Sequence, residues 1–322
     1  MTQLFAMVDE DNATMDAAGF QQRFQALEAN ISKVVVASQR TVHLALLGLF
    51  ADGHVLVEDR PGVGKTLLAK TIAQSIDGTF TRVQFTPDLL PSDITGSSVF
   101  NPQTGRFDFM PGPIFTNVLL ADELNRTNPR TQSALLEAMA EGQVTIDGTS
   151  RSLPPPFMVI ATQNPLDSSG TFPLPETELD RFLVRISIGM PSPDDEMEIL
   201  LRSEHRQAEV ESVLTCAAVL AMQACVRQVQ VTTPVKEYLI RLARFVRAHE
   251  DVRRGVSPRG TVLLQRASQA WAAYQARDYV TPSDVHAVAT SVLAHRITVD
   301  GQDPAHAETV VQEALGSVPV PV

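Results

Sequence analysis

The stretch HVLVEDRPGVGKT, residues 54–66, decides the fold of this chain. It begins as a short apolar run, which predicts a buried strand, and then turns through glycines into Gly64-Lys65-Thr66. The following residues 67–73, LLAKTIA, are good helix formers with apolar side chains on one face. Strand, glycine loop and helix together predict a cradle in which backbone N–H groups and a helix N-terminus face a phosphate.

In such a phosphate loop, the P-loop or Walker A motif, each residue type has a specific role in binding the nucleotide. Lys65 is expected to reach the β- and γ-phosphates of a nucleotide, and Thr66 to offer its hydroxyl to Mg²⁺. The residues expected to bind the cofactor here are Pro61, Gly62, Val63, Gly64, Lys65, Thr66 and Leu67. Asp59 stands where the motif usually has its first glycine, and like charge predicts that its side chain turns away from the phosphates. The alternative is a glycine-rich turn that binds nothing.

Two carboxylates follow a second apolar strand. Residues 117–122, NVLLAD, predict a core strand that ends at Asp122, with Glu123 directly after it, as in a Walker B motif. Asp122 would then hold the Mg²⁺, and Glu123 would orient or deprotonate the attacking water. The alternative is a solvated helix cap. Asn164 follows a further strand at 157–162, where an amide could hold the lytic water or simply form a turn before Pro165.

Composition sets limits on the class of protein. A length of 322 residues with 44% hydrophobic and 20% charged residues is ordinary for a soluble globular protein of about two domains. The net charge of −11 argues against a dedicated nucleic-acid binder. No apolar run approaches the ~20 residues of a membrane span, and the acidic N-terminus is unlike a signal peptide. The two cysteines form neither a metal pattern nor a disulfide framework, so a cytoplasmic location is expected.

The order of elements predicts an α/β core followed by helices. Strands are expected at 54–58, 80–85, 117–122, 157–162 and 182–188, and their alternation with helices favours a parallel sheet with the site at its carboxyl edge. Hairpins are expected near 97–110 and 143–153. The predicted organisation is a mobile tail at 1–17, a nucleotide-binding domain at 18–190 and an all-helical lid domain at 191–322.

From about Lys33 to Arg296, the chain resembles the MoxR family of AAA+ ATPases, whose P-loop core carries a helical lid. The resemblance is carried by eight strings in order: QFTPDLLPSDITG (84–96), DELNR (122–126), TQSALLEAM (131–139), QVTIDG (143–148), TQNP (162–165), PLPETELDRF (173–182), SPR (257–259) and DYVTPSDV (278–285). These long strings are far more specific than the glycine loop alone.

The resemblance implies roles that spacing cannot show. Asn164 would be the sensor beside the γ-phosphate, and Arg181 an arginine finger acting on ATP of the neighbouring subunit. Arg259 would be a second sensor that reaches from the lid to the phosphates, and so a further cofactor-binding residue. Without the resemblance, a surface salt bridge would be the simpler interpretation of both arginines. The family also implies a ring, usually a hexamer, with the hairpins facing its pore or a partner. It further implies chaperone-like remodelling of protein complexes, often with a von Willebrand factor A-domain partner.

Three functions therefore compete. The favoured one is a MoxR-type ATPase that hydrolyses Mg–ATP to remodel or mature protein complexes, with no nucleic acid involved. A DNA-acting motor would instead show DNA-stimulated turnover with steep salt dependence. An assembly switch would bind ATP tightly without releasing phosphate.

Overall fold

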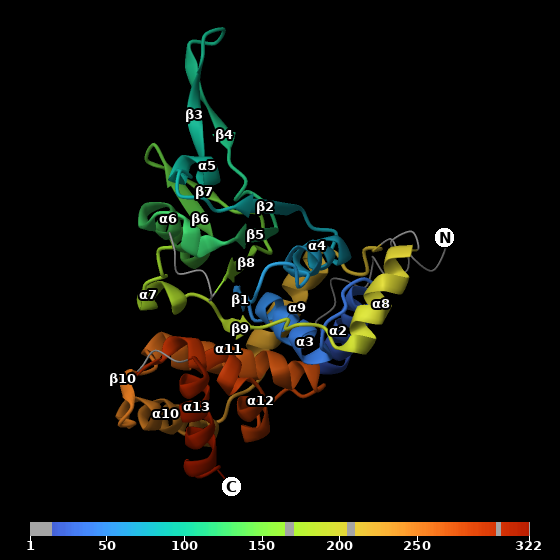
Figure 1. Cartoon of the computed structure of the whole chain (residues 1–322), viewed down its shortest axis with the longest axis vertical. Coiled ribbons are helices and arrows are strands. Elements are labelled where there is room, and N and C mark those ends of the chain that lie inside the picture. Colours follow the sequence, from blue (N-terminus) through green and yellow to red (C-terminus); the bar gives the residue numbers. More distant parts are fainter. Residues whose placement is uncertain (1–14, 165–170, 205–209, 301–303, 322) are drawn as a thin grey trace.

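A computed structural model describes residues 15–164, 171–204, 210–300 and 304–321. At its centre lies a five-stranded parallel sheet with the strand order β2-β5-β8-β1-β9 (Figure 1). The strands are β1 (Val55–Glu58), β2 (Phe80–Gln84), β5 (Val118–Asp122), β8 (Met158–Gln163) and β9 (Val184–Ile186). This confirms the predicted α/β core, including all five strands.

Alternate side chains of the strands enter two separate apolar clusters, as the period of two in a strand requires. Val55 and Val57 lie in the first cluster, whereas Leu56 lies in the second, and all three are fully buried. The helices of the first face are α2 (Ala17–Ser32), α3 (Gln39–Phe50) and α4 (Lys65–Ser75). Those of the opposite face are α5 (Pro91–Thr95) and α6 (Pro129–Glu141). The sheet is therefore covered on both sides, as parallel sheets usually are.

Over its described residues, the C-terminal part is helical, as predicted, except for one short antiparallel strand pair. Its helices are α8 (Pro193–Glu204), α9 (Cys216–Gln228), α10 (Thr233–Ala248), α11 (Pro258–Tyr274), α12 (Pro282–Leu293) and α13 (Pro304–Ser317), with the 3₁₀ turn η2 (Ala294–Arg296). The strand pair is β10 (Val252–Arg254) and β11 (Thr298–Val299). Within the described parts of the chain, no helix is both long and apolar enough to cross a bilayer.

The helical part shares apolar contacts with the core. Residues of α9 and α11 belong to the same cluster as α2 and α3, and Gln223 Nε2 donates to the Leu49 carbonyl at 2.8 Å. The predicted domain boundary at residue 190 thus lies in the segment that connects the core to the helical part, and these two parts pack against each other. The predicted tail at 1–17 lies almost wholly outside the described residues.

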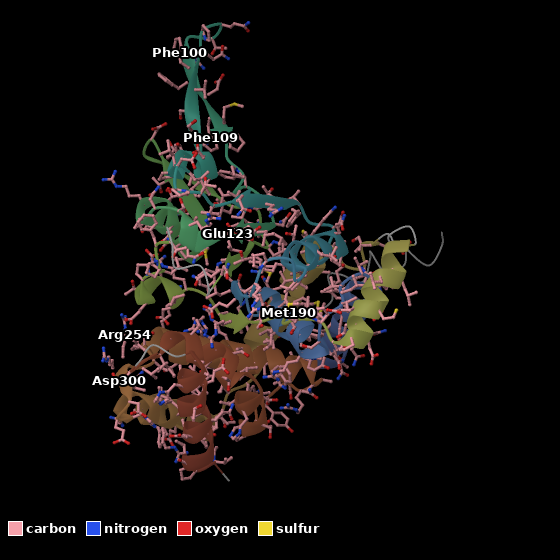
Figure 2. The ribbon with its side chains drawn as sticks, in the orientation of Figure 1. Phe100, Phe109, Glu123, Met190, Arg254 and Asp300 are labelled. Atoms are coloured by element: carbon pink, nitrogen blue, oxygen red, sulfur yellow. The ribbon has the colours of Figure 1, made fainter. Side chains whose placement is uncertain are left out.

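Both expected hairpins form. They are β3 (Gly96–Asn101) with β4 (Arg106–Pro111), and β6 (Gln143–Ile146) with β7 (Thr149–Ser152). The β3–β4 hairpin projects from the body of the molecule, with Phe100 toward its tip and Phe109 near its base (Figures 1 and 2). Phe107, across the ladder from Phe100, is 70% exposed, and the two rings pack edge to face. An apolar surface of this kind, held away from the core, is typical of a contact with another molecule.

Candidate functional site

The loop between β1 and α4 has the backbone that a phosphate cradle needs. Gly62 has φ +91° and Gly64 has φ +98°, in the left-handed region that glycine adopts without steric cost. A Cβ built on either residue would meet nothing within 4 Å, so backbone conformation rather than crowding requires glycine here. The helix α4 begins at Lys65, directly after Gly64, so its N-terminal N–H groups belong to this loop.

Lys65 is half-buried at the start of α4. Its Nζ donates to the Asp59 carbonyl oxygen at 2.6 Å, which folds the side chain back along the loop. Burial lowers the pKa of Lys65, while the charges of Asp59, Asp122 and Glu123 act in the opposite direction. The ammonium group therefore lies close to both carboxylates of the predicted Walker B motif.

Asp59 points away from the loop, as like charge predicted. Its carboxylate accepts hydrogen bonds from the Ser187 hydroxyl at 2.7 Å, the Ile188 N–H at 2.5 Å and the Gly189 N–H at 3.3 Å. These donors lie in the segment that leads from β9 to the helical part of the chain. The residue in the first-glycine position thus anchors this connecting segment beside the phosphate loop.

Thr162, at the end of β8, holds the two carboxylates in place. Its Oγ1 donates to Asp122 Oδ1 at 2.7 Å and accepts the Glu123 N–H at 2.8 Å, and the residue is fully buried. Asp122 Oδ2 accepts two hydrogen bonds from Arg82 on β2, at 2.5 and 3.1 Å. Sequence reasoning assigned no role to Thr162 or Arg82, although Thr162 begins the string TQNP.

Glu123 lies on a sharp turn between β5 and the 3₁₀ turn η1 (Leu124–Arg126). Its φ of +56° is unusual for a residue with a Cβ, and its Oε2 accepts a hydrogen bond from Arg126 Nη1 at 2.9 Å. Asn164 is half-buried and follows β8, which lies between β5 and β1. Because Gln163 pairs in register with Glu58, Asn164 stands level with the first residue of the phosphate loop. Lys65, Asp122, Glu123 and Asn164 therefore meet at the carboxyl edge of the sheet.

The oxygen atoms at this edge suit a magnesium nucleotide. Thr66 supplies a hydroxyl in the first turn of α4 and Asp122 a carboxylate at the end of β5. The described residues contain no group of three or more His, Cys, Asp or Glu that could hold a metal. Two protein oxygens are nevertheless enough for Mg²⁺, which usually takes its remaining ligands from phosphates and water. The residues present thus fit the metal and the nucleotide.

Arg181 lies just after the short helix α7 (Glu176–Leu179) and three residues before β9, so it stands near the amino ends of the parallel strands. Its Nη1 donates to the Leu136 carbonyl of α6 at 2.5 Å, and its Nε is buried without a hydrogen-bond partner. Among the residues that the structure describes, no carboxylate forms an ion pair with Arg181. The simple interpretation as a surface salt bridge therefore has no support in this chain.

Arg259 lies in the first turn of α11, exposed to solvent. The pKa of His54 falls to about 4, mainly because the imidazole is buried and in smaller part because the Arg259 charge is near. His54 precedes β1, whereas the phosphate loop follows β1, and four strand residues span about 13 Å. Ser257, two residues before Arg259, donates a hydrogen bond to Asp180, which precedes β9, and β9 runs parallel to β1. Arg259 thus lies toward the amino ends of the strands, opposite the phosphate loop of its own chain, and no described carboxylate pairs with it.

Comparisons with known proteins agree with this geometry. Residues 54–184 match the model of the ATPase family associated with various cellular activities (AAA), and residues 244–315 match that of the AAA lid domain. Chaperone MoxR1 of Mycobacterium tuberculosis is 39% identical over 90% of this chain and 80% of its own. Protein MoxR of Paracoccus denitrificans is 31% identical over 93% of this chain and 96% of its own. A crystal structure from Cytophaga hutchinsonii, 33% identical, superposes with a TM-score of 0.87 over 98% of both chains. The chain therefore belongs to the MoxR family of AAA+ ATPases.

Proposed function

We propose that this chain binds and hydrolyses Mg–ATP and uses the energy for chaperone-like remodelling or maturation of protein complexes. The observation that carries the proposal is the meeting of Lys65, Asp122, Glu123 and Asn164 at one edge of the sheet. Lys65 and the loop N–H groups would hold the β- and γ-phosphates, while Thr66 and Asp122 would hold Mg²⁺. The metal would neutralise charge on the phosphates. Glu123 would take the proton of the attacking water, and Asn164 would hold that water or the γ-phosphate.

The two arginines support an active site that is shared between subunits. Arg259 lies toward the sheet edge opposite the phosphate loop of its own chain, and neither Arg259 nor Arg181 has a described carboxylate partner. An unpaired guanidinium is suited to an anion supplied from outside the chain. We therefore assign Arg181 as the arginine finger and Arg259 as the second sensor, both acting on ATP bound to a neighbour. Such an arrangement requires a neighbouring subunit, and a homo-hexameric ring is the form expected from the family.

The client and partner surface would include the β3–β4 hairpin, because it carries exposed apolar side chains away from the body. The name of the M. tuberculosis relative, Chaperone MoxR1, supports a protein client rather than a nucleic acid. The proposal places this work in the cytoplasm, with a von Willebrand factor A-domain protein as a partner.

The first test is steady-state phosphate release against protein concentration, with Mg–ATP in excess and with or without DNA. Specific activity is expected to rise with protein concentration, because assembly completes each active site, and to be unaffected by DNA. A DNA-stimulated rate would favour the motor instead. A near-zero rate with tight ATP binding at every concentration would favour the assembly switch.

Lys65→Ala is expected to weaken ATP binding by about 10–100-fold or more, because a charge-assisted contact with the phosphates is lost. Equilibrium titration with a fluorescent ATP analogue measures the effect. Lys70→Ala is the matched control, since Lys70 is an exposed lysine on the same helix, outside the phosphate loop. Wild-type affinity in the Lys65→Ala protein would show that the nucleotide binds elsewhere.

A further inference from the structure

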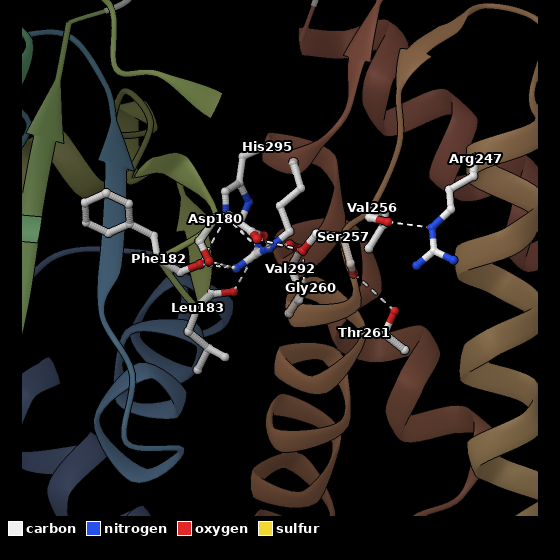
Figure 3. Close-up of polar contacts among 11 residues, drawn as sticks. Asp180, Phe182, Leu183, Arg247, Val256, Ser257, Gly260, Thr261, Val292 and His295 are labelled. Carbon is white, nitrogen blue, oxygen red and sulfur yellow. Dashed lines mark hydrogen bonds and ion pairs between the residues drawn. The ribbon is translucent and has the colours of Figure 1, made fainter. Parts of the chain in front are cut away.

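A polar cluster, half-buried on one side and buried on the other, joins the end of α7 to the first turn of α11 (Figure 3). It consists of Asp180, Ser257, His295 and Arg296, and we call it the Asp180 joint. Ser257 Oγ donates to Asp180 Oδ2 at 2.6 Å, and Arg296 Nε donates to Asp180 Oδ1 at 2.9 Å. The Arg296 side chain is only 1% exposed and that of Asp180 is 17% exposed, so this ion pair is largely shielded from solvent. One carboxylate thus connects the nucleotide-binding core with two helical segments of the lid.

The Arg296 guanidinium makes several hydrogen bonds besides the one to Asp180. It also donates to the backbone carbonyls of Phe182, Leu183 and Val292, and its Nη1 lies 2.6 Å from His295 Nε2. Burial lowers the pKa of Arg296 to about 10, against the effect of Asp180, so the group stays charged at neutral pH. Burial also lowers the pKa of His295, which is therefore a neutral neighbour. The Asp180 carboxylate is therefore paired with a charged guanidinium that has little freedom to move.

The start of α11 is fixed against Arg296 by close packing. A Cβ built on Gly260 would lie 2.9 Å from Arg296 Cδ and 2.8 Å from Val256 Cγ1, so only glycine fits. On the lid side, Arg247 Nε of α10 donates to the Val256 carbonyl at 2.6 Å. Ser257 is also the N-cap of α11 and accepts the Gly260 N–H at 3.0 Å. The helix start is therefore held by α10 on one side and by Asp180 on the other.

The joint lies between the two arginines assigned above. Asp180 directly precedes Arg181, and Ser257 is two residues before Arg259. Each arginine is therefore at most two residues along the chain from one end of the Ser257–Asp180 hydrogen bond. We propose that the Asp180 joint is a positioning device that fixes Arg181 and Arg259 relative to each other, so that both reach the neighbour's nucleotide together. This inference rests on the proposed function. A movement of the lid would then be transmitted to the arginine finger through the Ser257–Asp180 hydrogen bond.

The test uses three substitutions at one position, because removing Asp180 would leave the buried Arg296 charge unpaired and endanger folding. Ser257→Ala loses both the helix cap and the bond to Asp180. Ser257→Asp keeps a cap acceptor but places a second carboxylate against Asp180. Ser257→Thr keeps both interactions. If the joint positions the arginines, the Ala and Asp variants lose activity and the Thr variant keeps it.

The readouts separate positioning from folding. For Ser257→Ala and Ser257→Asp, kcat is expected to fall about tenfold or more while ATP affinity and ring size stay at wild-type values. Mixing either variant with Glu123→Gln protein is expected to restore phosphate release, because the latter supplies intact arginines to the variant's intact phosphate loop. A protein that had merely lost its fold would neither bind ATP nor be rescued in this way.

Thr298→Val is the matched control. The Thr298 hydroxyl also donates from the lid to a carboxylate of α7, that of Glu176, but this contact is solvent-exposed and lies five residues before Arg181. An equal fall of kcat in the Thr298→Val protein would overturn the special role of Asp180. Normal turnover in Ser257→Asp together with a loss in Ser257→Ala would reduce the role of Ser257 to capping and also overturn it.

A mixture of Arg181→Ala with Glu123→Gln serves as the reference. If this mixture is active and the Ser257 variants turn over normally alone, the joint inference fails while the proposed function stands. If the reference mixture releases no phosphate, the proposal of a shared active site is wrong, and the inference that rests on it is wrong as well.

Discussion

Glu123→Gln is expected to lower kcat for ATP hydrolysis by about 10²–10⁴-fold while ATP binding is retained. The carboxylate lies just beyond β5, where its N–H is bonded to Thr162 and its Oε2 to Arg126. Glutamine has nearly the same shape and still accepts from Arg126, so the turn should form normally. What it loses is the ability to accept the proton of water. The measurement is single-turnover hydrolysis of radiolabelled ATP beside equilibrium ATP binding.

Glu137→Gln provides the control, because Glu137 is an exposed carboxylate on α6 that lies outside the site. It should hydrolyse ATP at the wild-type rate. If Glu123→Gln also retained wild-type turnover, the base would have to be another group. If it lost ATP binding instead, the carboxylate would have a structural role in the loop.

The phosphate loop, the acidic pair and the five strands were predictable because each depends on residues adjacent in the sequence. An apolar run that ends in GVGKT specifies strand, turn and helix locally, and the outward direction of the Asp59 carboxylate follows from charge alone. The partners of that carboxylate did not follow, since Ser187 and Ile188 lie about 130 residues away. They meet Asp59 only because β9 pairs with β1.

The contacts of Thr162, Arg82 and Asp180 could not be predicted either, because their partners are also distant in the sequence. Thr162 and Arg82 each lie 40 residues from Asp122 and reach it through the pairing of β8 and β2 with β5. Asp180 and Arg296 are 116 residues apart, and nothing in the local sequence indicates that they pair or that Arg296 is buried. The β10–β11 pair was missed because strands of three and two residues carry too little periodicity to detect. The roles of Arg181 and Arg259 came from family resemblance, and they stay predictions.

Arg181→Ala is expected to leave ATP binding unchanged and to reduce hydrolysis by about 10³–10⁵-fold, the range known for arginine fingers. In this chain Arg181 contacts the Leu136 carbonyl, and its Nε is buried without a partner. A buried donor left unpaired costs free energy, so the guanidinium gains by moving to an anion that accepts from Nε together with a terminal nitrogen. The γ-phosphate on a neighbouring subunit is such an anion.

The decisive form of this experiment mixes two inactive proteins. Arg181→Ala carries an intact phosphate loop and Glu123, while Glu123→Gln carries an intact Arg181, so a mixed interface contains one complete site. Phosphate release should therefore reappear in the mixture and pass through a maximum as the ratio of the two proteins is varied. Arg130→Ala, an exposed arginine at the start of α6, should be active alone. A mixture with no more activity than its components would mean that Arg181 acts within its own subunit, since only a residue acting across the interface can be supplied by another chain.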